Sequence, residues 1–247
     1  MVDDAHFREH GWVLTDTLDA AGADAVRRFV AEIAAWPDDG AWLHYRESTV
    51  HGPKLCRTEN VIPFHTGMRE FLSTGAMVET ASQLLGQQAV LYKEKINYKL
   101  AGGAGYSPHQ DAPAYRFVEQ HVSCMVAVDD ATAANGCLEV VSGAHDEVLP
   151  MDERGCIRAD VVASLRWEAV PLRAGQTLWF HSRTPHRSGP NRSIHDRRAL
   201  YPTYNALAEG DLRERYYAQK QMELAAARTA GDRVPVSLIG DFEGRPV

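Results

Sequence analysis

The sequence is poor in cysteine and in clustered positive charge, and both shortages exclude classes of function. Its four cysteines never form a Cys-X-X-Cys pair, so they exclude the usual zinc and dithiol motifs and are expected to be reduced, partly buried side chains. Lysine and arginine total 26 against 33 aspartate and glutamate residues, a formal net charge of -7. Without a basic block the chain is a poor match to nucleic acid, whose binding depends on clustered cations.

Long apolar runs are also missing. No stretch approaches the roughly 18 consecutive apolar residues of a membrane span, and the first residues, MVDDAH, are acidic where a secretory signal would be basic. We therefore expect a soluble, cytoplasmic protein whose partner is a small molecule rather than nucleic acid or a membrane. The sequence leaves the oligomeric state open.

Internal repeats and Pro/Gly/Ser-rich linkers are absent as well, so the simplest interpretation is a single domain over residues 1–247. Apolar residues recur at helical spacing over 19–36 and 68–85, which predicts a helical N-terminal part over about 1–88. A further helix, packed outside the rest, is expected over about 211–229.

Between these helical parts, from about 89 to 206, short β-rich runs alternate with turn residues. This pattern predicts a mainly β fold with peripheral α-helices, a sandwich or barrel of the jelly-roll type, rather than an alternating βαβ sheet. The expected strands are 89–99, 121–128, 137–141, 167–172, 176–181 and 198–206.

Histidine, in contrast, is abundant, and one of the 11 histidines lies two positions from an aspartate in the segment SPHQDAPAY. If this segment is extended, His109 and Asp111 point to the same face and can reach one metal ion. A third ligand is expected on another strand, and His186, after the run 176–181, is the strongest candidate. Two histidines and one carboxylate leave three coordination positions open, as in non-haem Fe(II) oxygenases, although these ligand types also suit zinc.

Arg197 lies eleven residues after His186 and favours the oxygenase. A 2-oxo acid co-substrate binds iron through its keto and adjacent carboxylate oxygens, and its far carboxylate requires a fixed cation such as a guanidinium. Arg198 adjoins Arg197 and is the alternative partner. Because neighbours on an extended strand face opposite sides, only one of the two can enter the barrel.

On these residues the sequence resembles the phytanoyl-CoA dioxygenase-like family of Fe(II)/2-oxoglutarate-dependent oxygenases. The resemblance covers roughly 89–206. It rests on His-Gln-Asp at 109–111, on NGCLEVVSGAH at 135–145, and on a histidine, a serine two residues later and an arginine eleven residues later within 186–197. Family spacing favours Arg197 over its neighbour as the carboxylate partner.

The resemblance implies a fold, a set of cofactors and roles for several residues. The fold is a double-stranded β-helix, a cupin-like jelly roll, and the reaction uses Fe(II), 2-oxoglutarate and O2 to hydroxylate an unactivated C–H bond. His145 departs from the family pattern, because Ala144 precedes it instead of serine, and it is expected to be structural. The implied metal ligands and catalytic residues are His109, Asp111 and His186, and the implied contacts of the far 2-oxoglutarate carboxylate are Arg197 and Ser188.

Substrate contacts are predicted from the run LYKEKINYK at 91–99. Alternation along an extended strand puts Lys93, Lys95 and the side chains at 97 and 99 on one face, which either enters the barrel or protects an exposed edge strand. If the face enters the barrel it requires an anionic partner, because buried cations demand one. We assign Lys95 to 2-oxoglutarate. The expected substrate-binding residues are Asn97, Tyr106, Tyr115, Arg57 and Arg116.

Three runs, KEKINYK at 93–99, HQDAPAY at 109–115 and IGDFEG at 239–244, resemble the branch of the family that hydroxylates small aminoalkylphosphonates at the carbon next to phosphorus. The alternatives are a natural-product or amino-acid hydroxylase of the same family, a zinc hydrolase, and a non-catalytic β-barrel binding domain. The substrate, the stereochemistry, and desaturation or cyclisation in place of hydroxylation stay open. The polar segments 40–66 and 144–166 are expected to be lids.

Overall fold

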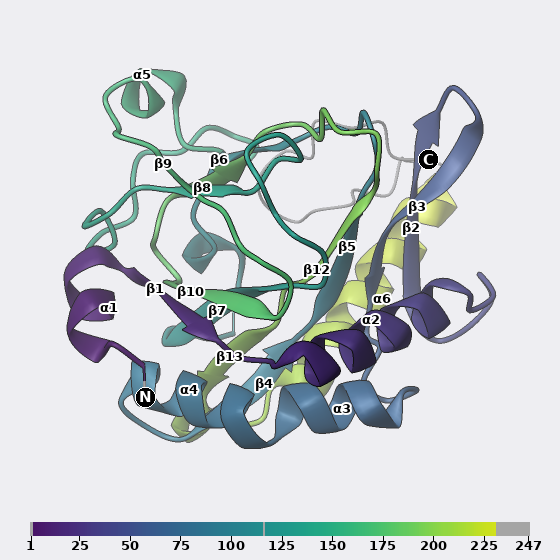
Figure 1. Cartoon of the computed structure of the whole chain (residues 1–247), viewed down its shortest axis with the longest axis horizontal. Helices are drawn as coiled ribbons and strands as arrows, with labels where there is room; N and C mark the ends of the chain where they lie inside the picture. Colours follow the sequence, from purple (N-terminus) through teal and green to yellow (C-terminus); the bar gives the residue numbers. More distant parts are fainter. Residues whose placement is uncertain (1, 116, 231–247) are drawn as a thin grey trace.

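Two antiparallel sheets pack face to face in the computed structural model, which describes residues 2–115 and 117–230 (Figure 1). Within these residues the arrangement is the double-stranded β-helix that the sequence predicts, with a nine-stranded major and a four-stranded minor sheet. The major sheet contains β1 (Trp12–Asp16), β2 (Leu43–Thr49), β3 (Gly52–Glu59), β4 (Ala89–Lys93), β5 (Lys95–Lys99), β7 (His121–Ala127), β10 (Gln176–His181), β12 (Arg197–Leu200) and β13 (Thr203–Ala206). The minor sheet contains β6 (Tyr106–His109), β8 (Leu138–Val140), β9 (Glu168–Val170) and β11 (His186–Ser188).

The central strands β7 and β10 of the major sheet are buried on both faces. Its strands follow the order β1-β10-β7-β12-β5-β3-β2, with β13 paired to β7 and β4, and the minor sheet runs β6-β11-β8-β9. Along β7, Met125 and Ala127 pack between the two sheets, whereas Cys124 and Val126 pack on the outer face. Because successive side chains of such a strand point to two buried faces in turn, its sequence is a continuous run of apolar residues.

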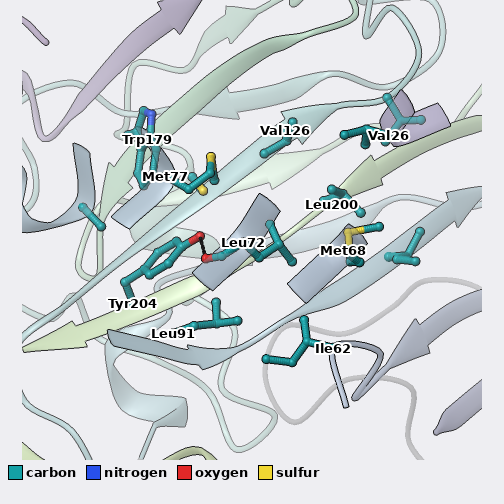
Figure 2. Close-up of a cluster of buried hydrophobic side chains, with 14 of the residues drawn as sticks. Val26, Ile62, Met68, Leu72, Met77, Leu91, Val126, Trp179, Leu200 and Tyr204 are labelled. Atoms are coloured by element: carbon teal, nitrogen blue, oxygen red, sulfur yellow. Dashed lines mark hydrogen bonds between the residues drawn. The ribbon is translucent and has the colours of Figure 1, made fainter. Parts of the chain in front are cut away.

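Helices cover the outer face of the major sheet: α2 (Ala20–Ala34), α3 (Thr66–Ser73) and α4 (Gly75–Leu85). The start of α2 is fixed by Asp19, whose side chain accepts a hydrogen bond from the backbone of Gly22. Figure 2 shows the apolar side chains of this layer, where the hydroxyl of Tyr204 donates to the carbonyl oxygen of Leu72 over 2.8 Å. Because these helices lie on the outer face, the candidate site lies on the other side of the major sheet, between the two sheets.

The remaining helical elements are α1 (Asp4–His10), α5 (Ala159–Val162) and α6 (Arg213–Ala230), with 3-10 turns at Ala112–Ala114 and Leu207–Glu209. Helix α6, coloured yellow in Figure 1, confirms the helix expected over 211–229 and lies against β4. In the described part of the chain, none of the helices is long and apolar enough to cross a membrane.

The part expected to be helical, about 1–88, contains α1 to α4 but also three strands of the major sheet in its described residues. Strand β1 pairs with β10, and β2 and β3 form a hairpin that extends the major sheet beside β5. The hairpin also replaces most of the irregular lid expected over 40–66. Sequence periodicity missed it because its inward side chains are polar: Glu47, Arg57 and Glu59 are all buried, so no apolar alternation marks the strands.

Three expected elements are each broken in two. Thr74 adopts an extended conformation and Gly75 has a φ of 58°, so the helix expected over 68–85 becomes α3 and α4. Glu94 separates β4 from β5, and its buried carboxylate accepts hydrogen bonds from the backbone of the segment before α3. Pro202 lies between β12 and β13, because proline cannot donate to the strand ladder.

Candidate metal centre and active site

Three side chains that can bind metal meet where β6 and β11 pair. His109 ends β6, Asp111 follows two residues later, and His186 begins β11 directly opposite His109. All three are buried, and one ligand atom of each lies within 4.8 Å of the others. The Nε2 atom of His186 is 4.0 Å from Oδ1 of Asp111. The fold therefore brings together the three residues that we expect to be metal ligands.

Hydrogen bonds on the far side of each imidazole fix which nitrogen faces the centre. The carbonyl oxygen of Ser107 lies 2.7 Å from Nδ1 of His109, and that of Thr184 lies 3.0 Å from Nδ1 of His186. Because a carbonyl only accepts, each Nδ1 carries the proton and each Nε2 keeps a lone pair for a metal. Two imidazole nitrogens and one carboxylate oxygen form a donor set that fits Fe(II) with positions left for a co-substrate.

The surroundings give the three groups the protonation states that a cation requires. Burial, with the charge of nearby His186, lowers the pKa of His109 to about 3, and burial also lowers the pKa of His186. Burial opposes the ionisation of Asp111, yet the charges of His186 and of two lysines hold the pKa of this carboxyl below its ordinary value. Near neutral pH the site offers two neutral imidazoles and a carboxylate.

Ser123, which the sequence analysis did not single out, orients the Asp111 carboxylate. Its hydroxyl donates to Oδ2 of Asp111 over 2.6 Å, so Oδ1 is the oxygen nearer to His186. Ser123 lies on β7 in the otherwise apolar run HVSCMVAV at 121–128, and a lone hydroxyl in such a run is the signal that could have identified it. The hydrogen-bond partner of this candidate ligand is thus supplied by the opposite sheet.

Replacing Ser123 with alanine is expected to weaken metal binding by about 10- to 100-fold, because the hydrogen-bond partner of a ligand fixes its orientation. Anaerobic calorimetric titration of the metal-free protein with Fe(II) measures this. Thr203→Val serves as the control, because the Thr203 hydroxyl lies 3.1 Å from the Ser123 hydroxyl and no hydrogen bond joins it to Asp111 in the described structure. Unchanged affinity of Ser123→Ala would show that this bond does not position the carboxylate.

Arg197 points into the barrel and Arg198 points out, as alternation along β12 requires. Arg197 is 2% exposed, and its Nη2 donates to the carbonyl oxygen of Gly136 over 2.9 Å. Within the described residues, its Nε and Nη1 atoms are buried without a hydrogen-bond partner. Arg198 instead makes two hydrogen bonds to Asp129, of 2.8 and 2.7 Å. A buried guanidinium with unused donors fits the carboxylate of a ligand.

Ser188 lies near this guanidinium together with Lys99, a cation to which the sequence analysis gave no role. The ammonium group of Lys99 donates to Oγ of Ser188 over 2.9 Å and to the carbonyl oxygen of Gly136 over 3.2 Å. Gly136 has a φ of 73°, and a Cβ atom there would lie 2.3 Å from the carbonyl oxygen of Gly189. Only glycine fits at this crowded point, so the Asn-Gly turn at 135–136 also shapes the site.

The triad opens onto a cavity of about 470 Å³, counted with its open mouth, which suits a small molecule. Asn97 and Tyr106, two of the expected substrate contacts, line both this cavity and a neighbouring one that contains Arg197. Tyr115, a third, lines the triad cavity, and its hydroxyl lies 3.5 Å from Oδ1 of Asp111. These three side chains are therefore gathered around the candidate metal centre.

Arg57 reaches the same region from β3. Its Nε donates to Oδ1 of Asn97 over 3.0 Å, its Nη2 donates to the hydroxyl of Tyr106 over 2.9 Å, and its Nη1 lies 3.5 Å from Oε1 of Glu59. The guanidinium is thus engaged with protein groups and orients two side chains of the cavity. Arg116, the remaining expected substrate contact, lies outside the described residues.

Lys93 and Lys95 present two ammonium groups to the triad cavity. Lys95 lies on β5, between β12 and β3, and Lys93, at the end of β4, is 4% exposed, so the alternative of an exposed edge strand protected by these lysines is wrong. The ammonium group of Lys93 lies 4.5 Å from the ring centroid of Tyr115, and that of Lys95 lies 5.4 Å from the ring centroid of Tyr201. Neither ammonium group has a hydrogen bond or ion pair with a described residue. Burial lowers the pKa of Lys93 to about 8, and burial with the charge of Lys93 lowers the pKa of Lys95 well below its ordinary value.

The segment 144–166 is held beside the site by Gln110, the residue between the first two candidate ligands. The Gln110 side chain donates to the carbonyl oxygen of Glu147 over 2.9 Å and accepts from the backbone of Leu149 over 2.8 Å. His145 lies in this segment and packs against the ring of His181. It is not part of a metal-binding group, since the triad is the one such group among the described residues. The segment is irregular apart from α5, and its role as a lid remains a prediction.

Comparisons with known proteins agree with this geometry. The family model described as phytanoyl-CoA dioxygenase (PhyH) matches residues 7–199. A methylphosphonate hydroxylase from Gimesia maris is 47% identical over 236 residues, 94% of this chain and 91% of that protein. A 2-aminoethylphosphonate dioxygenase from an uncultured bacterium is 38% identical over 222 residues, 87% and 85% of the two chains. The solved structure of EctD from S. alaskensis with 2-oxoglutarate and 5-hydroxyectoine has 18% identity and a TM-score of 0.71 over 83% of this chain and 76% of that one, and it has the same fold.

Proposed function

The chain belongs to the phytanoyl-CoA dioxygenase family, and from this premise we propose that it hydroxylates a small phosphonate at the carbon atom bonded to phosphorus. It is an Fe(II)- and 2-oxoglutarate-dependent dioxygenase. The choice of a phosphonate draws on the names of the two relatives and on the charge of the cavity beside the triad.

In this proposal His109, Asp111 and His186 hold the iron. The unused donors of Arg197, with Ser188 beside them, would bind the far carboxylate of 2-oxoglutarate when this co-substrate is present. Lys95, the third contact expected for 2-oxoglutarate, lines the triad cavity beside Lys93, and in this proposal its ammonium group faces the phosphonate instead. A zinc hydrolase would leave the buried guanidinium without a ligand, so this arrangement favours the oxygenase.

When bound, Fe(II) and 2-oxoglutarate supply the oxidation: one atom of O2 enters succinate as CO2 is lost, and the other enters the C–H bond as a hydroxyl group. Two of the four electrons that reduce O2 come from 2-oxoglutarate and two from the C–H bond, so no further reductant is needed. The residues of this chain orient the two reactants and exclude water. Leu138 and Phe180 line the triad cavity and keep part of its wall apolar.

The observation that carries the phosphonate assignment is the pair of ammonium groups on Lys93 and Lys95. Asp111 and Glu59 act on Lys93 and Lys95 as nearby charges, but no described residue forms a hydrogen bond or ion pair with either ammonium group. Burial of the two ammonium groups therefore costs free energy that an anion bound between them offsets. A phosphonate group offers three oxygen atoms and up to two negative charges to this pair. Asn97 adds an amide whose oxygen is already held by Arg57, which leaves its nitrogen as a donor.

Replacing Lys93 with methionine tests this assignment. Methionine keeps the volume and removes the charge, and loss of one partner of a buried charge pair costs about 2–5 kcal/mol, so kcat/KM for methylphosphonate is expected to fall by about 100-fold or more. Steady-state succinate formation measures it. The KM for 2-oxoglutarate and the slow succinate formation without substrate should persist. Lys54→Met, at an exposed lysine of β3, is the control. An unchanged kcat/KM in Lys93→Met would remove the lysine pair from substrate binding.

A further inference from the structure

A second compartment adjoins the candidate metal centre and has no described lining residue in common with the cavity that contains Arg197. Arg57, Glu59, Lys93 and Lys95 line it, together with Tyr216 and Lys220 of α6 and the triad residues His109 and Asp111. From sequence alone, α6 was expected only to pack outside the β core. The helix instead supplies a wall and a charge to the place where a substrate of the metal centre would lie.

The compartment is rich in cations and has one carboxylate besides Asp111 among its described lining residues. That carboxylate is Glu59, which is 2% exposed. Lys220 donates a hydrogen bond to Oε2 of Glu59, and Nη1 of Arg57 lies 3.5 Å from its Oε1. Burial opposes ionisation, yet the charges of Lys220 and Arg57 hold the pKa of Glu59 at about 2. Both oxygens of Glu59 therefore already face a cation of the protein.

Lys220 is itself held in place. It is 6% exposed, and its ammonium group lies 5.5 Å from the ring centroid of Tyr45 and 5.7 Å from that of Tyr216. Two aromatic faces on the same cation stabilise it where it meets Glu59. The ion pair is thus a fixed part of the compartment wall rather than a surface contact.

We propose that the Glu59–Lys220 ion pair makes this compartment select phosphonates with an uncharged carbon chain over those that carry an amino group. An ammonium group on the substrate needs an anionic partner when it leaves water, and the pair occupies the one carboxylate besides Asp111 that the described lining residues offer. Lys93 and Lys95 bind the phosphonate end and repel a second cation. This inference rests on the proposed function and narrows its substrate class.

Two substrates of equal size test the inference on the wild-type enzyme. Propylphosphonate and 2-aminoethylphosphonate have the same number of non-hydrogen atoms and differ in a terminal methyl against a terminal ammonium group. We expect kcat/KM to favour propylphosphonate by about 100-fold, because the ammonium ion loses its hydration without gaining a partner. If the enzyme turns over neither, their inhibition constants against methylphosphonate give the same comparison.

The outcomes separate this inference from the proposed function. Equal values, or a preference for the amine, overturn the inference while the phosphonate hydroxylase stands. Failure of both compounds to bind also overturns it, because size and not charge would then decide. If methylphosphonate and the two longer phosphonates all leave succinate formation at its slow uncoupled rate, the proposed function itself fails.

Lys220→Met tests the residue responsible. Removal of the ammonium group frees one oxygen of Glu59, so the ratio of kcat/KM for 2-aminoethylphosphonate to that for propylphosphonate should rise by about 10-fold or more. The double variant Glu59→Gln/Lys220→Met should return to the wild-type ratio. Gln221→Met, at an exposed position of α6, is the control. If Lys220→Met leaves the ratio of the two kcat/KM values unchanged, the ion pair does not determine the selectivity. A general loss of packing would lower both kcat/KM values by the same factor and so would not change their ratio. If that variant does not fold, the wild-type comparison still decides.

Discussion

Replacing Asp111 with alanine is expected to abolish turnover. A bound metal contributes several kcal/mol to such a reaction, so loss of one of its three protein ligands should lower kcat by at least about 1,000-fold. The bound iron should fall in parallel, because two imidazoles alone form a weaker site. Succinate formation and metal analysis of the purified variant measure the two effects. The far-UV circular dichroism spectrum should not change, since Asp111 lies in a loop between β6 and the following 3-10 turn.

His195→Ala is the matched control for the triad. His195 is exposed and follows β11 in the same region of the chain as His186. Its removal should leave the iron content and kcat at wild-type values, whereas His186→Ala should behave like the Asp111 variant. Turnover at half the wild-type rate or more in Asp111→Ala would contradict the metal assignment.

Replacing Arg197 with alanine is expected to raise the KM for 2-oxoglutarate by about 100-fold or more, because a buried carboxylate that loses its guanidinium partner loses about 2–5 kcal/mol. The iron content should stay at the wild-type value, since the unused donors of Arg197 belong to a cavity next to the triad and not to the triad itself. Kinetics at varied 2-oxoglutarate and metal analysis give both quantities.

Arg198→Ala provides the matched control, because the two arginines are neighbours on β12 and differ in the side they face. Arg198 lies partly exposed against Asp129, and its loss should change stability slightly and the KM for 2-oxoglutarate by less than about 3-fold. If Arg198→Ala raises the KM and Arg197→Ala does not, the assignment of the carboxylate site is reversed.

The candidate metal centre was predictable because its signals are local. His109 and Asp111 are two residues apart, and the interval from His186 to Arg197 spans a single connection between two strands. Alternation along a strand implied that only one of Arg197 and Arg198 enters the barrel, and the spacing typical of the family favoured Arg197, which is the arginine that points inward. The inward face of Lys93 and Lys95 followed from the same rule, although sequence alone could not exclude an exposed edge.

The compartment wall was not predictable, because its members come from distant parts of the chain. Glu59 and Lys220 are 161 residues apart, and neither forms a recognisable pattern with its neighbours. The β2–β3 hairpin that carries Glu59 and Arg57 shows polar residues on its inward face, so the apolar alternation that identifies most half-buried strands is missing. Polar interiors built for a ligand are therefore where periodicity fails to identify strands.

The most direct test of the account is incubation of the enzyme with Fe(II), 2-oxoglutarate and methylphosphonate under ¹⁸O2, with mass analysis of both products. We predict that each succinate formed with substrate present is matched by one hydroxylated phosphonate, and that each of the two products gains one ¹⁸O atom. Succinate formed at the same rate with and without the phosphonate, and no gain in the mass of the phosphonate, would contradict the proposed hydroxylation.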